Sequence, residues 1–196
     1  SSSVWLRFCV DRIDRLQALI SGPRGTPYSN GLFIFDIAFP ATYPLEPPIV
    51  KIQTTGCGTV RFNPNLYANG KVCLSLLGTW YGDSAETWNE RSSSLLQVLI
   101  SIQSLILVDE PWYNEPGHEM KDGGKASRDY NIKLREDTVK WAMLDHLKRP
   151  KSPFDDVIKA HFRIKKKEIL AQLRVWRCDA SEIACNVYFP ELEAAL

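Results

Sequence analysis

The chain has 196 residues, enough for one well-buried domain with an appendage and too few for two large domains. Its 24 basic and 23 acidic residues leave a formal net charge of +1, so no bulk electrostatic footprint indicates nucleic acid or an anionic membrane as a partner. The most hydrophobic window, residues 95–108, is short for a membrane span and is interrupted by Gln and Ser. We therefore expect neither nucleic acid nor a membrane among the partners.

The cysteines are odd in number, scattered, and without a Cys-x-x-Cys motif. This pattern indicates neither a disulfide framework nor a structural zinc site, and the three histidines lie far apart in the sequence. We expect no metal, and a reducing compartment, the cytoplasm or also the nucleus. The five cysteines are Cys9, Cys57, Cys73, Cys178 and Cys185.

The first third of the chain has the pattern of an antiparallel meander. Residues 4–20 predict either one interrupted strand or two short strands. Residues 32–39 give the clearest strand, with its odd-numbered aromatic residues and Ile37 on one face. Four prolines within residues 40–48 predict a stiff connection into a strand at 49–53. The aromatic face of such a sheet needs a helix to cover it.

Helical periodicity dominates the rest. Apolar residues at 3–4 spacing predict a helix over 94–108, capped by the serines at 92–94 and ended by Pro111. A second helix is expected from Ser127 to Arg149, and Ser152-Pro153 predicts the start of a third. Residues 179–196 have weak periodicity, and no structure is assigned to 186–190. We predict an α+β fold, with a core domain at 1–149 and a C-terminal helical extension at 150–196.

The segment 61–77 places an Asn-Pro-Asn, an Asn-Gly and then Cys73 close together. Turn signals this dense predict a shaped loop, and a shaped loop beside a cysteine is a place for thiol chemistry. The competing interpretation is inert packing, because free cysteine is among the most buried residue types.

Several motifs in order give this sequence a resemblance to the ubiquitin-conjugating enzymes. They are Gly25-Thr-Pro-Tyr, Tyr43-Pro-Leu-Glu-Pro-Pro48, Asn63-Pro64-Asn65, Cys73 eight residues further on, and Trp88 before the apolar helix. Each motif alone is weak, but the combination spans about residues 12–145 with near-family spacing. The chain is most similar to the large, divergent members. The resemblance implies the fold of that family, a four-stranded antiparallel meander packed on helices.

The resemblance also implies a site. Cys73 would accept ubiquitin as a thioester, and Glu115, in the position of the family's acidic gate, would help to deprotonate the attacking lysine. Asn65 would either stabilise the oxyanion or hold the loop in shape, and we favour the loop role because its amide has local backbone partners. Asn63 and Pro64 would shape the loop. The surface for the activating enzyme and ligases would comprise Leu45, Glu46, Trp88, Asn89 and Glu90.

The sequence departs from the usual family pattern at several positions. Asn63 stands where most members have His, and Ser75 replaces the usual Asp. The loop from Gly78 to Glu86 is longer than usual, and the proline expected after Trp88 is missing, which weakens the expectation of binding to RING-type ligases. The amide of Asn63 can still donate and accept hydrogen bonds, so we expect activity to be retained.

The expected partners are ubiquitin, its activating enzyme, substrate lysines, and either a ligase or substrate-binding domains fused to this chain. ATP would be consumed by the activating enzyme, so we expect no cofactor here. Three alternatives remain open at this stage. The chain could be an inactive binding module of the same fold, could carry another ubiquitin-like modifier, or could be a thiol redox sensor with Cys57 as the resolving cysteine.

Overall fold

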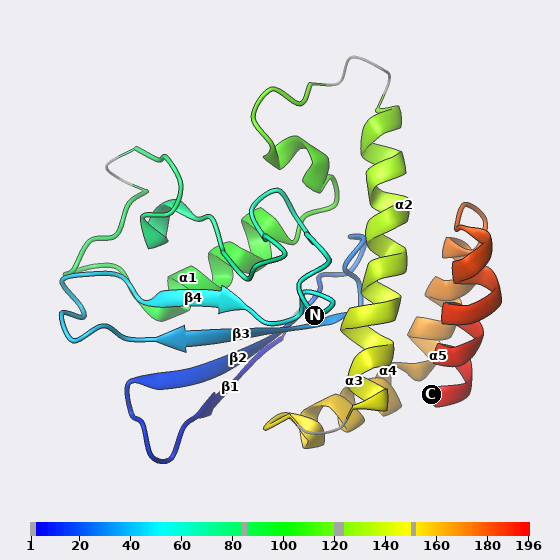
Figure 1. Ribbon diagram of the computed structural model, residues 1–196, viewed down its shortest axis with the longest axis horizontal. Helices are drawn as coiled ribbons and strands as arrows, with labels where there is room; N and C mark the ends of the chain where they lie inside the picture. Colours follow the sequence, from blue (N-terminus) through cyan, green and yellow to red (C-terminus); the bar gives the residue numbers. More distant parts are fainter. Residues whose placement is uncertain (1–2, 84–85, 120–123, 150–151) are drawn as a thin grey trace.

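The computed structural model describes residues 3–83, 86–119, 124–149 and 152–196. Its sheet has four antiparallel strands in the order β1-β2-β3-β4, which confirms the predicted meander (Figure 1). The first predicted segment proves to be two strands joined as a hairpin rather than one interrupted strand. The strands are β1 (Val4–Phe8), β2 (Arg15–Ser21), β3 (Leu32–Ala38) and β4 (Ile49–Ile52).

Alternation along the strands divides the sheet into two apolar faces. On one face Ala18 lies opposite Phe35, and Ile20 lies opposite Phe33. These residues belong to the larger buried cluster, so the predicted face of odd-numbered residues in β3 is confirmed. Leu19 lies between them in sequence, points to the opposite face and belongs to a second cluster.

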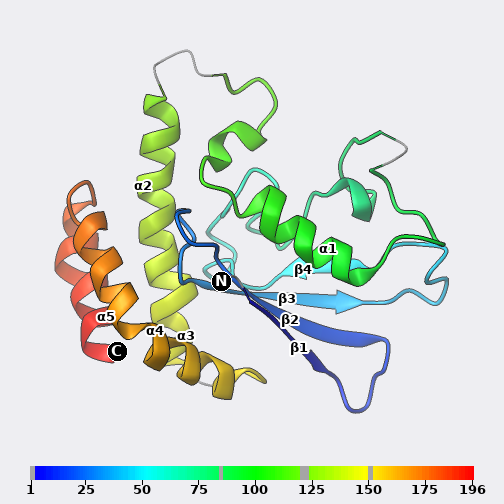
Figure 2. The same ribbon diagram turned by 180° about the vertical axis from the view of Figure 1, so that it is seen from behind.

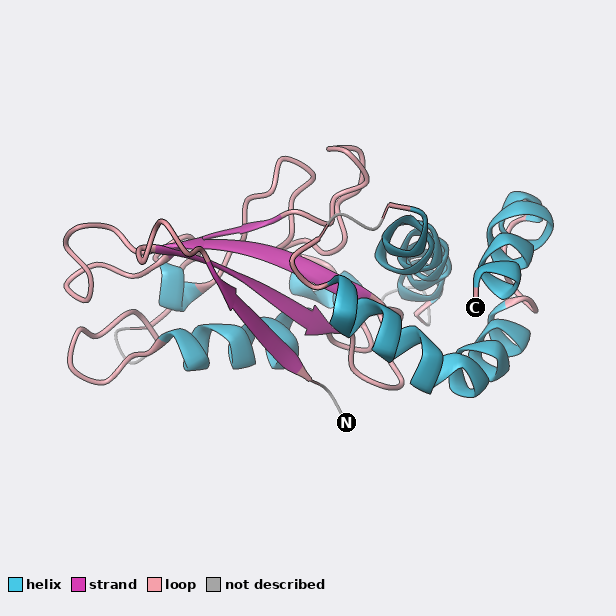
Figure 3. Ribbon diagram, turned by 90° about the horizontal axis from the view of Figure 1, so that it is seen from below, coloured by secondary structure: helices cyan, strands magenta, loops and turns pink. Residues whose placement is uncertain are grey.

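The face with the aromatic residues is covered by the predicted helix. It consists of α1 (Leu95–Ser101) and a π-helical segment, η2 (Ile102–Ile106), which run along one side of the sheet in Figures 1 and 3. Ser94 is its N-cap, because its side chain accepts a hydrogen bond from Gln97 N while the Gln97 side chain accepts one from Ser94 N. The helix ends before Pro111, as predicted.

The second half of the chain stacks helices beyond one end of the sheet (Figure 2). The start predicted at Ser152-Pro153 is two residues early, because Ser152 and Pro153 form a turn in which Ser152 Oγ accepts from Phe154 N. Residues 186–190, to which the sequence analysis assigns no structure, are helical. The elements are α2 (Lys125–Val139), η4 (Lys140–Leu144), α3 (Asp145–Lys148), α4 (Asp155–Trp176), η5 (Ala184–Tyr188) and α5 (Phe189–Ala195).

The C-terminal extension packs back on the sheet. The second cluster joins Leu19 and Leu32 of the sheet to Phe154 at the N-cap of α4, to Phe162 of α4 and to Phe189 of α5. Residues on both sides of the predicted domain boundary at 149/150 contribute to this cluster. The division into two domains stays a prediction. Among the described residues, no helix is both long and apolar enough to cross a membrane.

Candidate active site

Cys73 is locked to the loop that precedes it by a reciprocal pair of hydrogen bonds. Cys73 N donates to Asn65 O at 2.8 Å, and Asn65 Nδ2 donates to Cys73 O at 3.0 Å. The whole Cys73 residue is only 2% exposed. One of the two N–H donors of the Asn65 amide is thus used on a backbone carbonyl, which is the kind of contact that the favoured loop-shaping role requires.

Asn63 is a fully buried residue at the centre of a polar network. Its Nδ2 donates to Ile106 O at 2.7 Å, and its Oδ1 accepts from Asn65 N at 2.7 Å. Its residue exposure is 0%. The Asn114 amide adds a longer contact to Oδ1 of 3.4 Å. The replacement of the family's His by Asn63 therefore leaves a residue that both donates and accepts, and that joins the loop to η2.

Tyr28 supports this network from the turn between β2 and β3. Its hydroxyl donates to Phe62 O at 2.6 Å and lies 3.3 Å from Asn63 Nδ2. Burial raises the pKa of Tyr28 well above its usual value, so the phenol stays protonated and can donate. The sequence placed this tyrosine in a family motif, but gave no signal that it contacts the loop at Asn63.

Thr79 holds the chain on the other side of Cys73. The short 3-10 helix η1 (Ser75–Leu77) follows the cysteine and ends at Gly78, which adopts a left-handed conformation. The hydroxyl of Thr79 then donates to Val72 O at 2.7 Å and accepts from Leu74 N at 3.0 Å. The backbone of both residues that flank Cys73 is therefore hydrogen-bonded to one side chain, which was not singled out from the sequence.

Glu115 lies beside the Asn-Pro-Asn loop through an ion pair with Arg61. The loop carrying it begins with the 3-10 helix η3 (Pro111–Asn114), and its carboxylate Oε2 is 2.9 Å from Arg61 Nη2. The same Arg61 nitrogen donates to Pro64 O at 2.6 Å. Burial raises the pKa of the neighbouring Tyr130 to about 12, an effect that Arg61 opposes and Glu115 reinforces. Arg61 was not singled out from the sequence.

The predicted partner surface lies on two adjoining loops. Trp88 Nε1 donates to Pro44 O at 2.7 Å, which joins the loop of Trp88, Asn89 and Glu90 to the loop of Leu45 and Glu46. Leu45 is 67% exposed, and Asn89 and Glu90 are exposed as well. The structure therefore brings all five residues together, and gives Trp88 a structural contact in addition to its predicted binding role.

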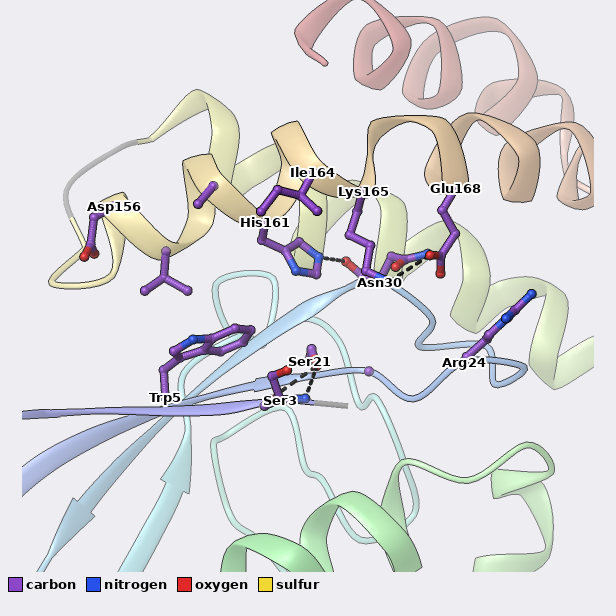
Figure 4. Close-up of a pocket in the computed structure, with 13 residues that line it drawn as sticks. Ser3, Trp5, Ser21, Arg24, Asn30, Asp156, His161, Ile164, Lys165 and Glu168 are labelled. Atoms are coloured by element: carbon purple, nitrogen blue, oxygen red, sulfur yellow. Dashed lines mark hydrogen bonds and ion pairs between the residues drawn. The ribbon is translucent and has the colours of Figure 1, made fainter. Parts of the chain in front are cut away.

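A groove of the molecule lies away from these residues. Within the described ranges all five cysteines are free thiols, and no group of three or more His, Cys, Asp or Glu side chains could hold a metal ion. A groove of about 400 Å³ lies between β1 and α4, lined by Trp5, His161 and Lys165 among others (Figure 4). It contains none of the predicted site residues.

Taken together, the meander, its covering helix and the loop of Asn63, Asn65 and Cys73 define a ubiquitin-conjugating enzyme domain. Residues 2–136 match the family model described as ubiquitin-conjugating enzyme, and the chain belongs to that family. A solved Toxoplasma gondii ubiquitin-conjugating enzyme E2 domain is similar, with a TM-score of 0.54 and 27% sequence identity. The match covers 71% of this chain and 88% of that one.

More similar sequences come from large proteins. The chain is 51% identical over 190 residues to the human dual E2 ubiquitin-conjugating enzyme/E3 ubiquitin-protein ligase BIRC6, covering 95% of this chain and 4% of that protein. It is 48% identical to the Caenorhabditis elegans probable ubiquitin-conjugating enzyme protein 17, covering 90% of this chain and 25% of that protein. The chain thus spans a small part of these relatives.

Proposed function

We propose that this chain is the conjugating domain of a larger enzyme, in which Cys73 accepts ubiquitin as a thioester and passes it to a substrate lysine. The observation that carries the proposal is the lock between Cys73 and Asn65 in a chain of this family. Because Cys73 is 2% exposed, loading requires local opening around the thiol. Cysteine suits such a relay, since its thiolate is both a good nucleophile and a good leaving group.

The chemistry has two steps at one sulfur. In loading, the Cys73 thiolate attacks the thioester of the activating enzyme, whose own thiolate leaves. In transfer, the substrate ammonium loses one proton and attacks the carbonyl; the nitrogen–carbon bond forms, the carbon–sulfur bond breaks, and the nitrogen loses a second proton. The Cys73 thiolate takes up one proton, so one proton is released overall. The reference pKa of lysine is about 10.4, so the substrate amine is protonated at neutral pH and a base must remove its first proton. We assign this role to Glu115.

The partners follow from this chemistry. They are ubiquitin, the activating enzyme at the loops of Leu45 and Trp88, and substrate lysines. ATP is consumed by the activating enzyme, so this chain needs no cofactor. The name of human BIRC6 joins conjugating and ligase activities, which supports the proposal that the rest of the larger protein selects substrates. We place the protein in the cytoplasm, with the nucleus as a second site, because five free thiols suit a reducing compartment.

The test is a loading assay with activating enzyme, ubiquitin and Mg-ATP, analysed with and without reductant. We expect a reducible adduct of one ubiquitin that is lost in Cys73→Ala and becomes resistant to reductant in Cys73→Ser. Cys9→Ala is the matched control, because Cys9 is exposed in the β1–β2 hairpin and should load normally. Activating enzyme that is charged first and then freed of ATP should still load the chain.

Three results would overturn the proposal. One is the absence of any adduct under conditions that charge another conjugating enzyme, which would favour an inactive binding module. The other is loading by a different ubiquitin-like modifier but not by ubiquitin. The third is loss of the adduct in Cys57→Ala with its retention in Cys73→Ala, which would place the thioester on Cys57 instead of Cys73.

A further inference from the structure

Arg61 is the structural link between the active-site loop and the loop of Glu115. One of its nitrogens, Nη2, donates both to Pro64 O at 2.6 Å and to Glu115 Oε2 at 2.9 Å. Pro64 is the middle residue of the Asn-Pro-Asn motif, whose last member is bonded to Cys73. A single guanidinium therefore connects the carboxylate to the backbone that carries the thiol.

The guanidinium is held on a third side by an aromatic ring. Its carbon Cζ lies 4.3 Å from the centroid of the Tyr67 ring, within the range of a cation–π contact. Tyr67 N donates to Lys71 O at 2.9 Å, so the ring is anchored in the turn that leads to Cys73. An arginine with a backbone acceptor, a carboxylate and a ring around it has little rotational freedom left.

The backbone of the Glu115 loop is tethered independently, by the residue before it. Asn114 Nδ2 donates to Leu105 O at 3.0 Å and lies 3.4 Å from Asn63 Oδ1. This tether fixes where the loop lies, but not where the Glu115 carboxylate points. Within the described part of the chain, no protein group hydrogen-bonds its Oε1, and the side chain is 35% exposed, so one carboxylate oxygen is open to an incoming amine.

We propose that Arg61 is a positioning residue that aims the Glu115 carboxylate at the substrate amine while leaving Oε1 to receive its proton. This inference rests on the proposed function and deepens it. Exposed ion pairs contribute little to stability, and the side chains of Arg61 and Glu115 are 41% and 35% exposed. The pair therefore matters for orientation, and its loss should leave the protein folded.

The experiment separates loading from transfer. The chain is charged with ubiquitin, the supply is stopped, and discharge of the thioester is followed in a single turnover with free lysine or with hydroxylamine as the acceptor. Lysine is protonated at neutral pH and needs a base, whereas hydroxylamine is already uncharged. Arg61→Ala should load normally and should slow discharge to lysine by roughly tenfold, with discharge to hydroxylamine little changed.

Four further variants define the result, with Glu115→Ala as the reference for the double variant. Arg61→Lys should recover part of the rate, because it keeps the charge but not the forked geometry. Arg61→Ala combined with Glu115→Ala should be no slower than Glu115→Ala alone, as expected if the arginine acts through the carboxylate. Arg163→Ala is the matched control, since this arginine is exposed on α4, and it should behave as the unmodified chain.

The outcomes are distinguishable. No loading of the unmodified chain would overturn the proposed function itself. Normal loading with an equal loss of discharge to lysine and to hydroxylamine in Arg61→Ala would overturn the inference, because it would show a merely structural role. An additional loss in the double variant, or unchanged lysine discharge in Arg61→Ala where Glu115→Ala is slow, would overturn it as well.

Discussion

The segments on the two sides of Cys73 are built in opposite ways. Before the cysteine, the loop of residues 62–66 is buried and its side-chain amides are hydrogen-bonded to the backbone. After it, most of the described residues between 78 and 93 are exposed, and Tyr81 is 98% exposed. The segment before the thiol is fixed by the core, and so are Leu74 and Leu77 directly after it. The chain becomes exposed to solvent only from residue 78 onward.

The difference shows how a buried cysteine can serve a reaction with another protein. A thiol that must attack and later leave needs a fixed geometry, which the buried segment supplies. It also needs a route of access for a partner, and an exposed loop can move at low cost because few buried contacts hold it. The side chain of Thr79 links both flanks of Cys73 to the open segment. The backbone adds a hydrogen bond from Thr79 N to Leu74 O at 3.3 Å.

The largest effect on stability is expected from a substitution of Asn63, in the buried segment before Cys73. Asn63→Ala leaves Ile106 O and Asn65 N without their buried partner, and each lost contact costs about 1–3 kcal/mol. We expect the free energy of unfolding to fall by roughly 3 kcal/mol, measured by chemical denaturation. Loading of Cys73 should slow with it, because the Asn65 backbone moves.

Two companions sharpen this measurement. Asn63→His provides one donor and one acceptor, so it should lose less stability than Asn63→Ala. Asn186→Ala is the matched control on the exposed surface of the extension, and should change the free energy of unfolding by less than about 0.5 kcal/mol. Equal losses in Asn63→Ala and Asn63→His would mean that shape rather than hydrogen bonding decides this position.

A smaller effect is expected at the junction itself. Thr79→Ala removes the hydroxyl that bonds Val72 O and Leu74 N, and should cost about 1 kcal/mol of the free energy of unfolding. The thiol becomes less well positioned, so the rate of thioester formation should fall by roughly threefold. Thr79→Ser keeps the hydroxyl and should restore the rate. A loss of stability in Thr79→Ala with unchanged loading would show that this contact does not position Cys73.

Much of this architecture could be predicted from the sequence. The alternation in residues 32–39 and the 3–4 spacing in 95–107 depend on local burial patterns, and the structure confirms both elements. The motif spacing predicted that Cys73 and Asn65 belong to one site, and in the structure the two residues are hydrogen-bonded to each other. Local pattern was sufficient because each of these elements buries one regular face.

The remainder depends on contacts between distant parts of the chain. Arg61 meets Glu115 across 54 positions of sequence, and nothing near either residue marks the pair. Within the predicted helical extension, residues 186–190 were given no structure because their periodicity is weak, and Phe189 and Leu192 are ordered by burial in the second cluster. In both cases tertiary packing decides the conformation, and one sequence alone does not display it.

The smallest effect is expected on the open side, at Tyr81. Its side chain is 98% exposed, so Tyr81→Ser should change the free energy of unfolding by less than about 0.5 kcal/mol. Discharge of the charged thioester to free lysine involves no protein partner, and should proceed at the unmodified rate. If instead Tyr81→Ser slowed this discharge as much as Thr79→Ala slows loading, the exposed segment would have to close over the thiol during the reaction. The contrast between the two sides of Cys73 would then describe the resting protein and not the reacting one.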